Sequence, residues 1–290
     1  MTMLAKTDQD IFENDGFLVL RQLLDTEVLE PVRQSVAEFV DNRIKKLVAA
    51  GVVGDPHEEA TFKTRWAKVG IENDLQKGEH ASREWGARNG LLPKSIYNLA
   101  VDSRLTDVIA SILGQEILLR GDYWVRPKIP GDPRTTFPWH QDSHYYGSFT
   151  GAHSTVLTVW IPLIDVDDHN GCLKLVRGSN QHASIELRRN EQGKPEPIKD
   201  ASNFGTVMSV PMKAGDVLVF TNYTLHASGT NSSDHVRWSI DIRYAPFNEQ
   251  TDLPSHPGCV IRSEDSANLM SFARWEAKLR DAWKERLECE

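Results

Sequence analysis

The chain has 290 residues, 40% of them hydrophobic, so it can bury a substantial core. It carries 33 basic and 41 acidic residues, and this net charge of −8 argues against nucleic acid as its partner. It has no run of ~18 apolar residues and no apolar signal segment at its start, so we expect no membrane span and a cytoplasmic protein. The cysteines at 172, 259 and 289 lack CxxC spacing and predict neither a disulfide framework nor a thiolate zinc site.

The first fifty residues predict one short strand followed by a long helix. Residues 17–20 form an apolar run of strand type directly after the turn Asp15-Gly16. Asp25 is suited to cap the following helix, because its side chain can accept from a free backbone N–H of the first turn. Apolar residues recur at helical spacing from Val28 to Val40, so we expect this helix to bury one stripe against a sheet.

Residues 51–95 are polar and rich in glycine, and they predict a long irregular insertion. Such an insertion in a compact domain is either a lid that faces the substrate or a piece of surface. A helix is expected next, over residues 95–113, and Gly114 is well suited to end it.

From residue 117 onwards the pattern changes to about eight short strands separated by turns, such as the one at Asp168-His169-Asn170-Gly171. Regular spacing with this turn chemistry predicts a mainly β fold with flanking helices, whose core is a double-stranded β-helix, the cupin-like jelly roll. Residues 183–203 are a second candidate lid, and a last helix is expected over residues 266–287. We therefore expect a single domain, residues 1–290, in three parts: mostly helical support with a possible lid (1–116), the jelly-roll core (117–247) and a C-terminal helix (263–288).

The segment Trp139-His140-Gln141-Asp142 carries a histidine and a carboxylate two positions apart, and His226 follows 84 residues after the carboxylate. Residues two apart on a strand point to the same side, so His140 and Asp142 can meet a histidine from another strand. Two imidazoles and one carboxylate on one face of a metal leave the other positions open, as in non-haem Fe(II) oxygenases. The pair alone is a weak signal, and the distal histidine with its following residues strengthens it.

Arg237 and Ser239 follow His226 on the next expected strand, where residues two apart share a face. An arginine fork beside a hydroxyl can receive a carboxylate in bidentate fashion. The distal carboxylate of 2-oxoglutarate is such a group. The alternative is that Arg237 forms a structural ion pair with one of three aspartates: Asp216, Asp234 or Asp241.

Motifs in a fixed order extend over most of the chain: Asp15-Gly16-Phe17-Leu18-Val19-Leu20-Arg21, Trp139 to Asp142, Trp160-Ile161-Pro162-Leu163, Asn170-Gly171-Cys172-Leu173, Arg177-Gly178-Ser179-Asn180, Ala214 to Phe220, His226 and Arg237-Trp238-Ser239. As an ordered set they resemble the phytanoyl-CoA dioxygenase family of Fe(II)/2-oxoglutarate oxygenases. The resemblance implies three iron ligands, His140, Asp142 and His226. It also implies Arg237, helped by Ser239, as the anchor of 2-oxoglutarate. It places Trp160 near this co-substrate, and a plain core position is the alternative for that side chain.

The same resemblance implies an enzyme that uses Fe(II), 2-oxoglutarate and O2 to oxidise an unactivated C–H of a small organic molecule, with release of succinate and CO2. Related halogenases have a small residue in place of the carboxylate, so Asp142 favours hydroxylation, desaturation or another oxidation. No basic cluster suited to a CoA diphosphate stands out. An acyl-CoA substrate is therefore not expected. The runs at residues 160–163 and 237–243 resemble the natural-product members of the family, such as terpenoid hydroxylases, and this resemblance implies a secondary metabolite as substrate.

Substrate contacts are expected from residues beside the three ligands: Gln141, His144, Tyr146, Asn222 and Tyr223. Their aromatic and polar groups suit a medium-sized, partly apolar molecule. Arg243 and Asp241 are either substrate contacts or a structural pair, and the structural pair is favoured. The protein is expected to be a monomer or a homodimer. Two alternatives to an oxygenase stay open. One is a cupin-like isomerase or metal-binding protein, and the other is a non-catalytic sensor of 2-oxoglutarate.

Overall fold

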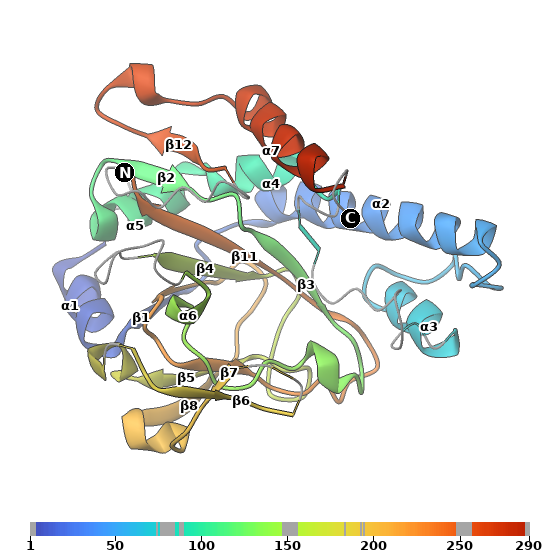
Figure 1. Cartoon of the computed structure of the whole chain (residues 1–290), viewed down its shortest axis with the longest axis horizontal. Coiled ribbons are helices and arrows are strands. Elements are labelled where there is room, and N and C mark those ends of the chain that lie inside the picture. The colour runs from blue at the N-terminus through green and yellow to red at the C-terminus, as the bar shows by residue number, and fades with distance from the viewer. Residues whose placement is uncertain are drawn as a thin grey trace.

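The computed structural model describes residues 4–73, 75, 85–86, 90–146, 156–182, 184–191, 193, 195–247 and 257–287 (Figure 1). Two antiparallel sheets form its centre. The larger sheet has the strand order β1 (Phe17–Leu20), β9 (Val217–Thr221), β4 (Leu157–Pro162), β11 (Arg237–Pro246), β2 (Ile117–Leu119) and β12 (Cys259–Arg262), and β3 (Trp124–Lys128) also pairs with β11. The smaller sheet has the order β10 (His226–Ser228), β5 (Leu173–Arg177) and β8 (Thr206–Val210), and a separate hairpin joins β6 (Leu187–Arg189) to β7 (Pro195–Pro197).

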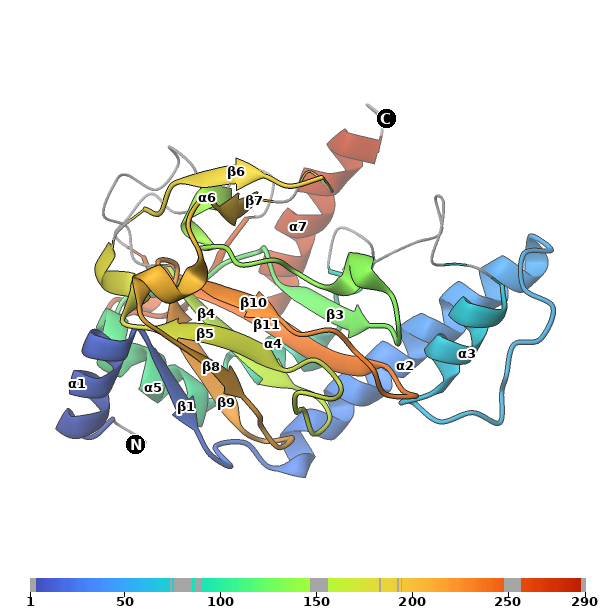
Figure 2. The same ribbon diagram turned by 90° about the horizontal axis from the view of Figure 1, so that it is seen from below.

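Helices cover the side of the larger sheet that faces away from the smaller one, as Figures 1 and 2 show for α2 and α4. The described α-helices of the whole chain, on either side of the sheet, are α1 (Lys6–Asp15), α2 (Thr26–Ala49), α3 (Arg65–Glu72), α4 (Lys94–Ala100), α5 (Ser103–Leu113), α6 (Ser143–Tyr146) and α7 (Phe272–Leu287). Short 3₁₀ turns lie at Pro133–Thr135, Ser179–His182, Ala201–Phe204 and Ser266–Asn268. The two stacked sheets with flanking helices confirm the predicted jelly-roll class. None of the described helices is long and apolar enough to cross a membrane.

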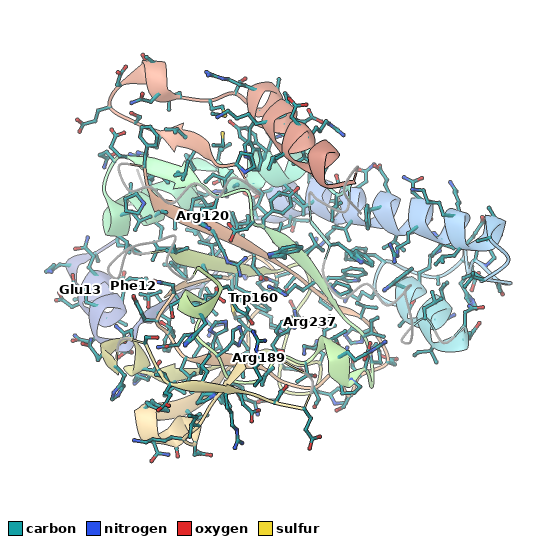
Figure 3. The ribbon with its side chains drawn as sticks, in the orientation of Figure 1. Phe12, Glu13, Arg120, Trp160, Arg189 and Arg237 are labelled. Atoms are coloured by element: carbon teal, nitrogen blue, oxygen red, sulfur yellow. The ribbon has the colours of Figure 1, made fainter. Side chains whose placement is uncertain are left out.

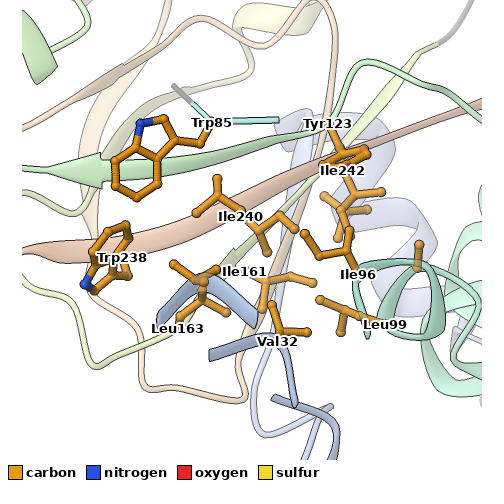
Figure 4. Packing of buried hydrophobic residues seen from close by; sticks show 14 of the residues in the cluster. Val32, Trp85, Ile96, Leu99, Tyr123, Ile161, Leu163, Trp238, Ile240 and Ile242 are labelled. Atoms are coloured by element: carbon orange, nitrogen blue, oxygen red, sulfur yellow. The ribbon is translucent and has the colours of Figure 1, made fainter. Parts of the chain in front are cut away.

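The main core lies between the helices and the outer face of the larger sheet (Figure 4). Val32 of α2 and Leu99 of α4 pack there with Ile161 and Ile240 from the sheet, and all four side chains are fully buried. Burial of this kind contributes roughly 25 cal/mol per Å² of apolar surface, so packing against the helical layer stabilises the sheet.

Strand β11 shows how one sequence serves both faces of the sheet. In the run Arg237-Trp238-Ser239-Ile240-Asp241-Ile242-Arg243-Tyr244, the apolar residues belong to the core under the helices. The alternate residues are polar or charged, yet they are buried as well. Because side chains alternate across a strand, these polar groups point towards the smaller sheet. The charged side chains of β11 therefore lie inside the jelly roll, and its apolar side chains pack in the main core.

The helix boundaries differ from the predicted ones at three places. The stretch expected as one helix over residues 95–113 is two, because Asp102 accepts a hydrogen bond from the Arg104 N–H and starts a new helix there. Residues 51–95 are not irregular throughout, since α3 forms within them and buries Trp66. The last helix begins at Phe272 after a 3₁₀ turn, later than expected. The start of α2 after Asp25, which accepts from the Val28 N–H, is confirmed, as is the end of α5 at Gly114.

Candidate active site

Three side chains converge between the two sheets. His226 opens β10, and its backbone pairs with that of His140 through two hydrogen bonds of 2.9 Å. Asp142 lies two residues after His140, at the turn into α6, so the two residues do not lie on one strand. Ligand atoms of the three residues lie within 4.8 Å of one another. Asp142 Oδ1 is 3.7 Å from His140 Nε2 and 3.8 Å from His226 Nε2, which is too far for hydrogen bonds and leaves room for an ion between them.

Both histidines present the same ring nitrogen to this centre. His140 Nδ1 lies 2.8 Å from the Pro138 carbonyl oxygen, and His226 Nδ1 lies 2.9 Å from the Thr224 carbonyl oxygen. A carbonyl oxygen only accepts, so each Nδ1 carries the proton and each Nε2 has a free lone pair. Burial lowers the pKa of His140 to about 3, with His226 adding to the effect, and burial also lowers the pKa of His226. Both rings are therefore neutral at pH 7, as metal ligands must be.

The carboxylate of Asp142 is held by its other oxygen. Oδ2 accepts from the Thr158 hydroxyl at 2.7 Å and from Arg243 Nη2 at 3.4 Å. Burial alone would raise the pKa of Asp142, but Arg243, the two histidines and Thr158 outweigh it, and the pKa is lowered. The group is thus ionised with Oδ1 directed at the histidines. Two neutral imidazoles and one carboxylate are the donor set that suits Fe(II) in open, oxygen-activating sites.

Arg237 lies in the same interior and forms no ion pair with the described residues, although the charge of Asp241 acts on it from nearby. It is 2% exposed, it donates from Nη1 to the Ser239 hydroxyl at 2.5 Å, and its Nε has no hydrogen-bond partner among the described residues. Burial lowers its pKa to about 10. Its guanidinium is 5.4 Å from the ring centre of Trp160, and Figure 3 shows both side chains between the sheets. A buried cation without a carboxylate partner is costly unless an anionic ligand binds to it.

The aspartates considered as partners for Arg237 are engaged elsewhere. Asp216 accepts from Arg21, Asp234 contacts His235, and Asp241 accepts from Arg126. The structural ion pair considered for Arg237 is therefore not formed in the described part of the chain.

One cavity joins the triad and Arg237, and the empty space in and above it is about 540 Å³. Its lining comes from both sheets and from the segment before His140. Besides the triad and Arg237, it comprises Arg126, Pro127, Lys128, Thr135, Phe137, Thr158, Trp160, Leu173, Phe220, Ala227, Ser228, Asp241 and Arg243. Lys128, which is 1% exposed, donates to the Thr135 carbonyl and the Ser228 hydroxyl.

The five residues expected at the substrate lie outside the described lining of this cavity. Gln141 is fully buried, donates to the Tyr223 carbonyl at 2.6 Å and accepts from the Ile185 N–H at 2.8 Å, so its amide joins three segments of the protein. His144 contacts the Gln141 and Ile185 carbonyls. Asn222 accepts from the Val156 N–H, and the side chain of Tyr146 lies outside the described part.

The cavity residues that the sequence did not single out include Arg126, Lys128 and Thr158. Arg243 was expected to pair with Asp241, and the two are 3.7 Å apart, but the same guanidinium also bonds to Asp142. A usable signal was present, since Arg243 continues the alternation that begins at Arg237. Thr158 offered none, because a threonine in an apolar strand is common.

Together, the stacked sheets, the His-Asp-His cluster and the buried arginine define a non-haem iron oxygenase of the jelly-roll class. The family model described as phytanoyl-CoA dioxygenase (PhyH) matches residues 12–239. The chain belongs to this family, and it is an Fe(II)- and 2-oxoglutarate-dependent dioxygenase that uses O2 as co-substrate.

Similar proteins include an ectoine dioxygenase of Bordetella bronchiseptica, which is 26% identical over 90% of this chain and 81% of its own length. A 1-deoxypentalenic acid 11-beta-hydroxylase of Streptomyces exfoliatus is 29% identical over 49% of this chain and 56% of its own. Among solved structures, EctD from S. alaskensis with 2-oxoglutarate and 5-hydroxyectoine aligns with a TM-score of 0.61 at 18% identity, over 84% of this chain and 79% of that one. This last similarity concerns the fold.

Proposed function

We propose that the enzyme holds Fe(II) through His140, Asp142 and His226, and that it hydroxylates an unactivated C–H of a small organic molecule with release of succinate and CO2. The observation that carries the proposal is Arg237. It is a buried guanidinium whose Nε has no hydrogen-bond partner among the described residues, and it lines the same cavity as the three converging ligand atoms. Iron alone needs no such cation, whereas 2-oxoglutarate brings a second carboxylate that does.

In this proposal Arg237 and the Ser239 hydroxyl bind the distal carboxylate of 2-oxoglutarate, and Trp160 flanks it. The bound iron, 2-oxoglutarate and O2 supply the oxidising chemistry, and the protein supplies orientation and exclusion of water. Thr158 and Arg243 keep one oxygen of Asp142 occupied, so the other is presented to the metal. The backbone carbonyls of Pro138 and Thr224 keep both imidazoles in the tautomer that can bind it.

The substrate class we propose is a secondary metabolite of moderate size. Support comes from the described cavity, which mixes apolar and charged walls, and from the similarity to a hydroxylase named for 1-deoxypentalenic acid. Solved structures of similar fold include a carbocyclase from nogalamycin biosynthesis, with a TM-score of 0.55. We further propose a cytoplasmic protein that acts as a monomer or a homodimer.

The test is an anaerobic titration of the protein with Fe(II) and 2-oxoglutarate, following the visible charge-transfer band of the chelate. We expect a band in the wild type, no band in Asp142→Ala, and a band that needs far more 2-oxoglutarate in Arg237→Met. Arg262→Met is the matched control, because Arg262 bonds to Asp107 and Gln115 away from the cavity. A wild type that folds but gives no band would point to one of the alternatives, an isomerase or a protein that binds another metal.

A further inference from the structure

Asp241 is a buried charge in the cavity that the iron and 2-oxoglutarate roles do not use. It is 4% exposed and lies on β11 between the proposed 2-oxoglutarate anchor and Arg243. Its Oδ2 accepts from Arg126 Nε at 2.6 Å. Its Oδ1 is buried and has no hydrogen-bond partner among the described residues, although the residue lines the cavity. Buried polar atoms are bonded in the great majority of cases, so this exception calls for a ligand.

The co-substrate cannot supply the missing bond. At neutral pH 2-oxoglutarate has two carboxylates and a carbonyl, all of which accept hydrogen bonds, and Asp241 Oδ1 also accepts. A carboxylate of 2-oxoglutarate placed against Oδ1 would be repelled by its like charge. A water molecule can donate a hydrogen bond to Oδ1, but any ligand that displaces this water must donate a hydrogen bond in its place.

The orientation of the carboxylate is set by its neighbours. The Arg126 guanidinium lies 4.8 Å from the ring centre of Phe137 and bonds to Oδ2, so Oδ1 is the oxygen left for a ligand. Arg243 Nη2 is 3.7 Å from Asp241 Oδ2 and 3.4 Å from Asp142 Oδ2. A single guanidinium nitrogen thus separates Asp241 from the carboxylate of the triad. A molecule bonded to Asp241 would be held beside the metal ligands.

We propose that Asp241 is a substrate-binding residue, and that the substrate presents a hydroxyl or N–H donor to its Oδ1. This inference rests on the proposed function, and it narrows the substrate to molecules with a donor group near the oxidised carbon. It excludes purely hydrocarbon chains as the part of the substrate that enters the cavity. A site built to bond such a donor rejects an analogue without it far more strongly than an apolar pocket rejects a missing methylene.

Asp241→Asn tests this idea with little change of shape. Arg126 Nε donates, so it takes the amide oxygen of the asparagine and turns the amide NH2 towards the cavity. The group facing the substrate then donates where the carboxylate accepted. Asp132→Asn is the matched control: Asp132 is also buried and also accepts from an arginine, Arg134, but it is not part of the described lining of this cavity.

The probes are matched sets of an alcohol, its methyl ether and the corresponding ketone, built on cyclohexane, indane and decalin skeletons. Binding is followed through the shift of the anaerobic charge-transfer band of the Fe(II)–2-oxoglutarate protein. In the wild type and in Asp132→Asn we expect alcohols to bind about tenfold or more tightly than their ethers. In Asp241→Asn this ratio should fall towards one and the ketones should gain.

The outcomes separate the two proposals. A wild type with a normal band that binds alcohols and ethers alike, or binds no alcohol at all, overturns the role of Asp241 and leaves the proposed function standing. Asp241→Asn that keeps the alcohol preference with a normal band does the same. A wild type without any band overturns the proposed function itself.

Discussion

The two faces of the larger sheet are built from the same strands and do different work. On the outer face, Trp238 and Ile240 pack under the helices and are fully buried. On the inner face, Arg237, Ser239 and Asp241 are equally buried but charged or polar. Burial of the apolar outer residues stabilises the fold. Burial of Arg237 and Asp241 costs free energy, which their bonds to Ser239 and Arg126 offset in part and the proposed ligands would offset further. Substitutions at neighbouring residues of these strands should therefore have different effects: one should change stability, and the next should change ligand binding.

The largest effect is expected from Ile240→Ala on the outer face. Ile240 is fully buried, and its pairing partners on either side are Ile161 and Val125. Truncating a buried isoleucine leaves a cavity, and the free energy of unfolding should fall by about 2–5 kcal/mol. Urea unfolding measures this loss, and the affinity of the folded protein for 2-oxoglutarate should stay within about twofold. Ser239→Ala, one residue away, should weaken the binding of 2-oxoglutarate and leave the free energy of unfolding nearly unchanged. Equal effects of the two variants on both quantities would contradict the separation of the faces.

A second prediction concerns the cost of the inner face. Because burying the charged Arg237 and Asp142 costs free energy, Fe(II) and 2-oxoglutarate that bind to them should stabilise the protein. At a ligand concentration of 100 times Kd the gain is about 2.7 kcal/mol. Anaerobic thermal unfolding with and without the two ligands gives the shift in Tm. In Arg237→Met the part due to 2-oxoglutarate should vanish while the part due to Fe(II) remains. A shift from 2-oxoglutarate that survives this change would place its anchor elsewhere.

The third prediction uses two adjacent residues of β4. Thr158 donates its hydroxyl to Asp142 at 2.7 Å, and Thr158→Val removes that bond without changing the shape. Loss of such a partner typically costs 10–100-fold in metal affinity, so Fe(II) should bind about that much more weakly. Val159→Thr is the mirrored control: it puts a hydroxyl into the apolar core and should lower stability, not iron affinity. Equilibrium Fe(II) titration under argon measures the iron affinity of both variants, and urea unfolding measures their stability. An unchanged iron affinity in Thr158→Val would show that Thr158 does not support the metal ligand.

The sequence predicted the features that depend on local spacing better than those that depend on contacts between distant residues. The shared face of Arg237 and Ser239 on β11 and the cap at Asp25 depend on local spacing, and both were predicted. The proximity of His140, Asp142 and His226 came from a motif and its family resemblance. The contact of Arg243 with Asp142 joins residues 101 positions apart, and no local pattern encodes which of two nearby carboxylates a guanidinium meets. Gln141 looked like a substrate contact because it lies between two ligands, yet its side chain points the other way and bonds to backbone.

The smallest effect is expected from a charge that supports only the outer layer. Asp102 caps α5 by accepting from the Arg104 N–H, and it also pairs with the Arg104 guanidinium at 2.9 Å. Two residues earlier, the Ala100 carbonyl accepts from the Tyr244 hydroxyl, which ties this segment to β11. The hydrogen bond from Arg104 lowers the pKa of Asp102 below its ordinary 3.8. The unfolded chain therefore takes up this proton at higher pH than the folded protein does. The contribution of the charge is present above about pH 4 and is lost as the pH falls below that.

Asp102→Asn keeps a capping side chain and removes the charge. At pH 6 the variant should be less stable by under ~1 kcal/mol, because the pair is partly exposed to solvent. At pH 3 the difference should shrink, since the wild type then loses the same charge. Urea unfolding at the two pH values gives both numbers, and Fe(II) affinity at neutral pH should be unchanged. A stability difference that is constant with pH would show that the cap, and not the charge, is what α5 takes from Asp102.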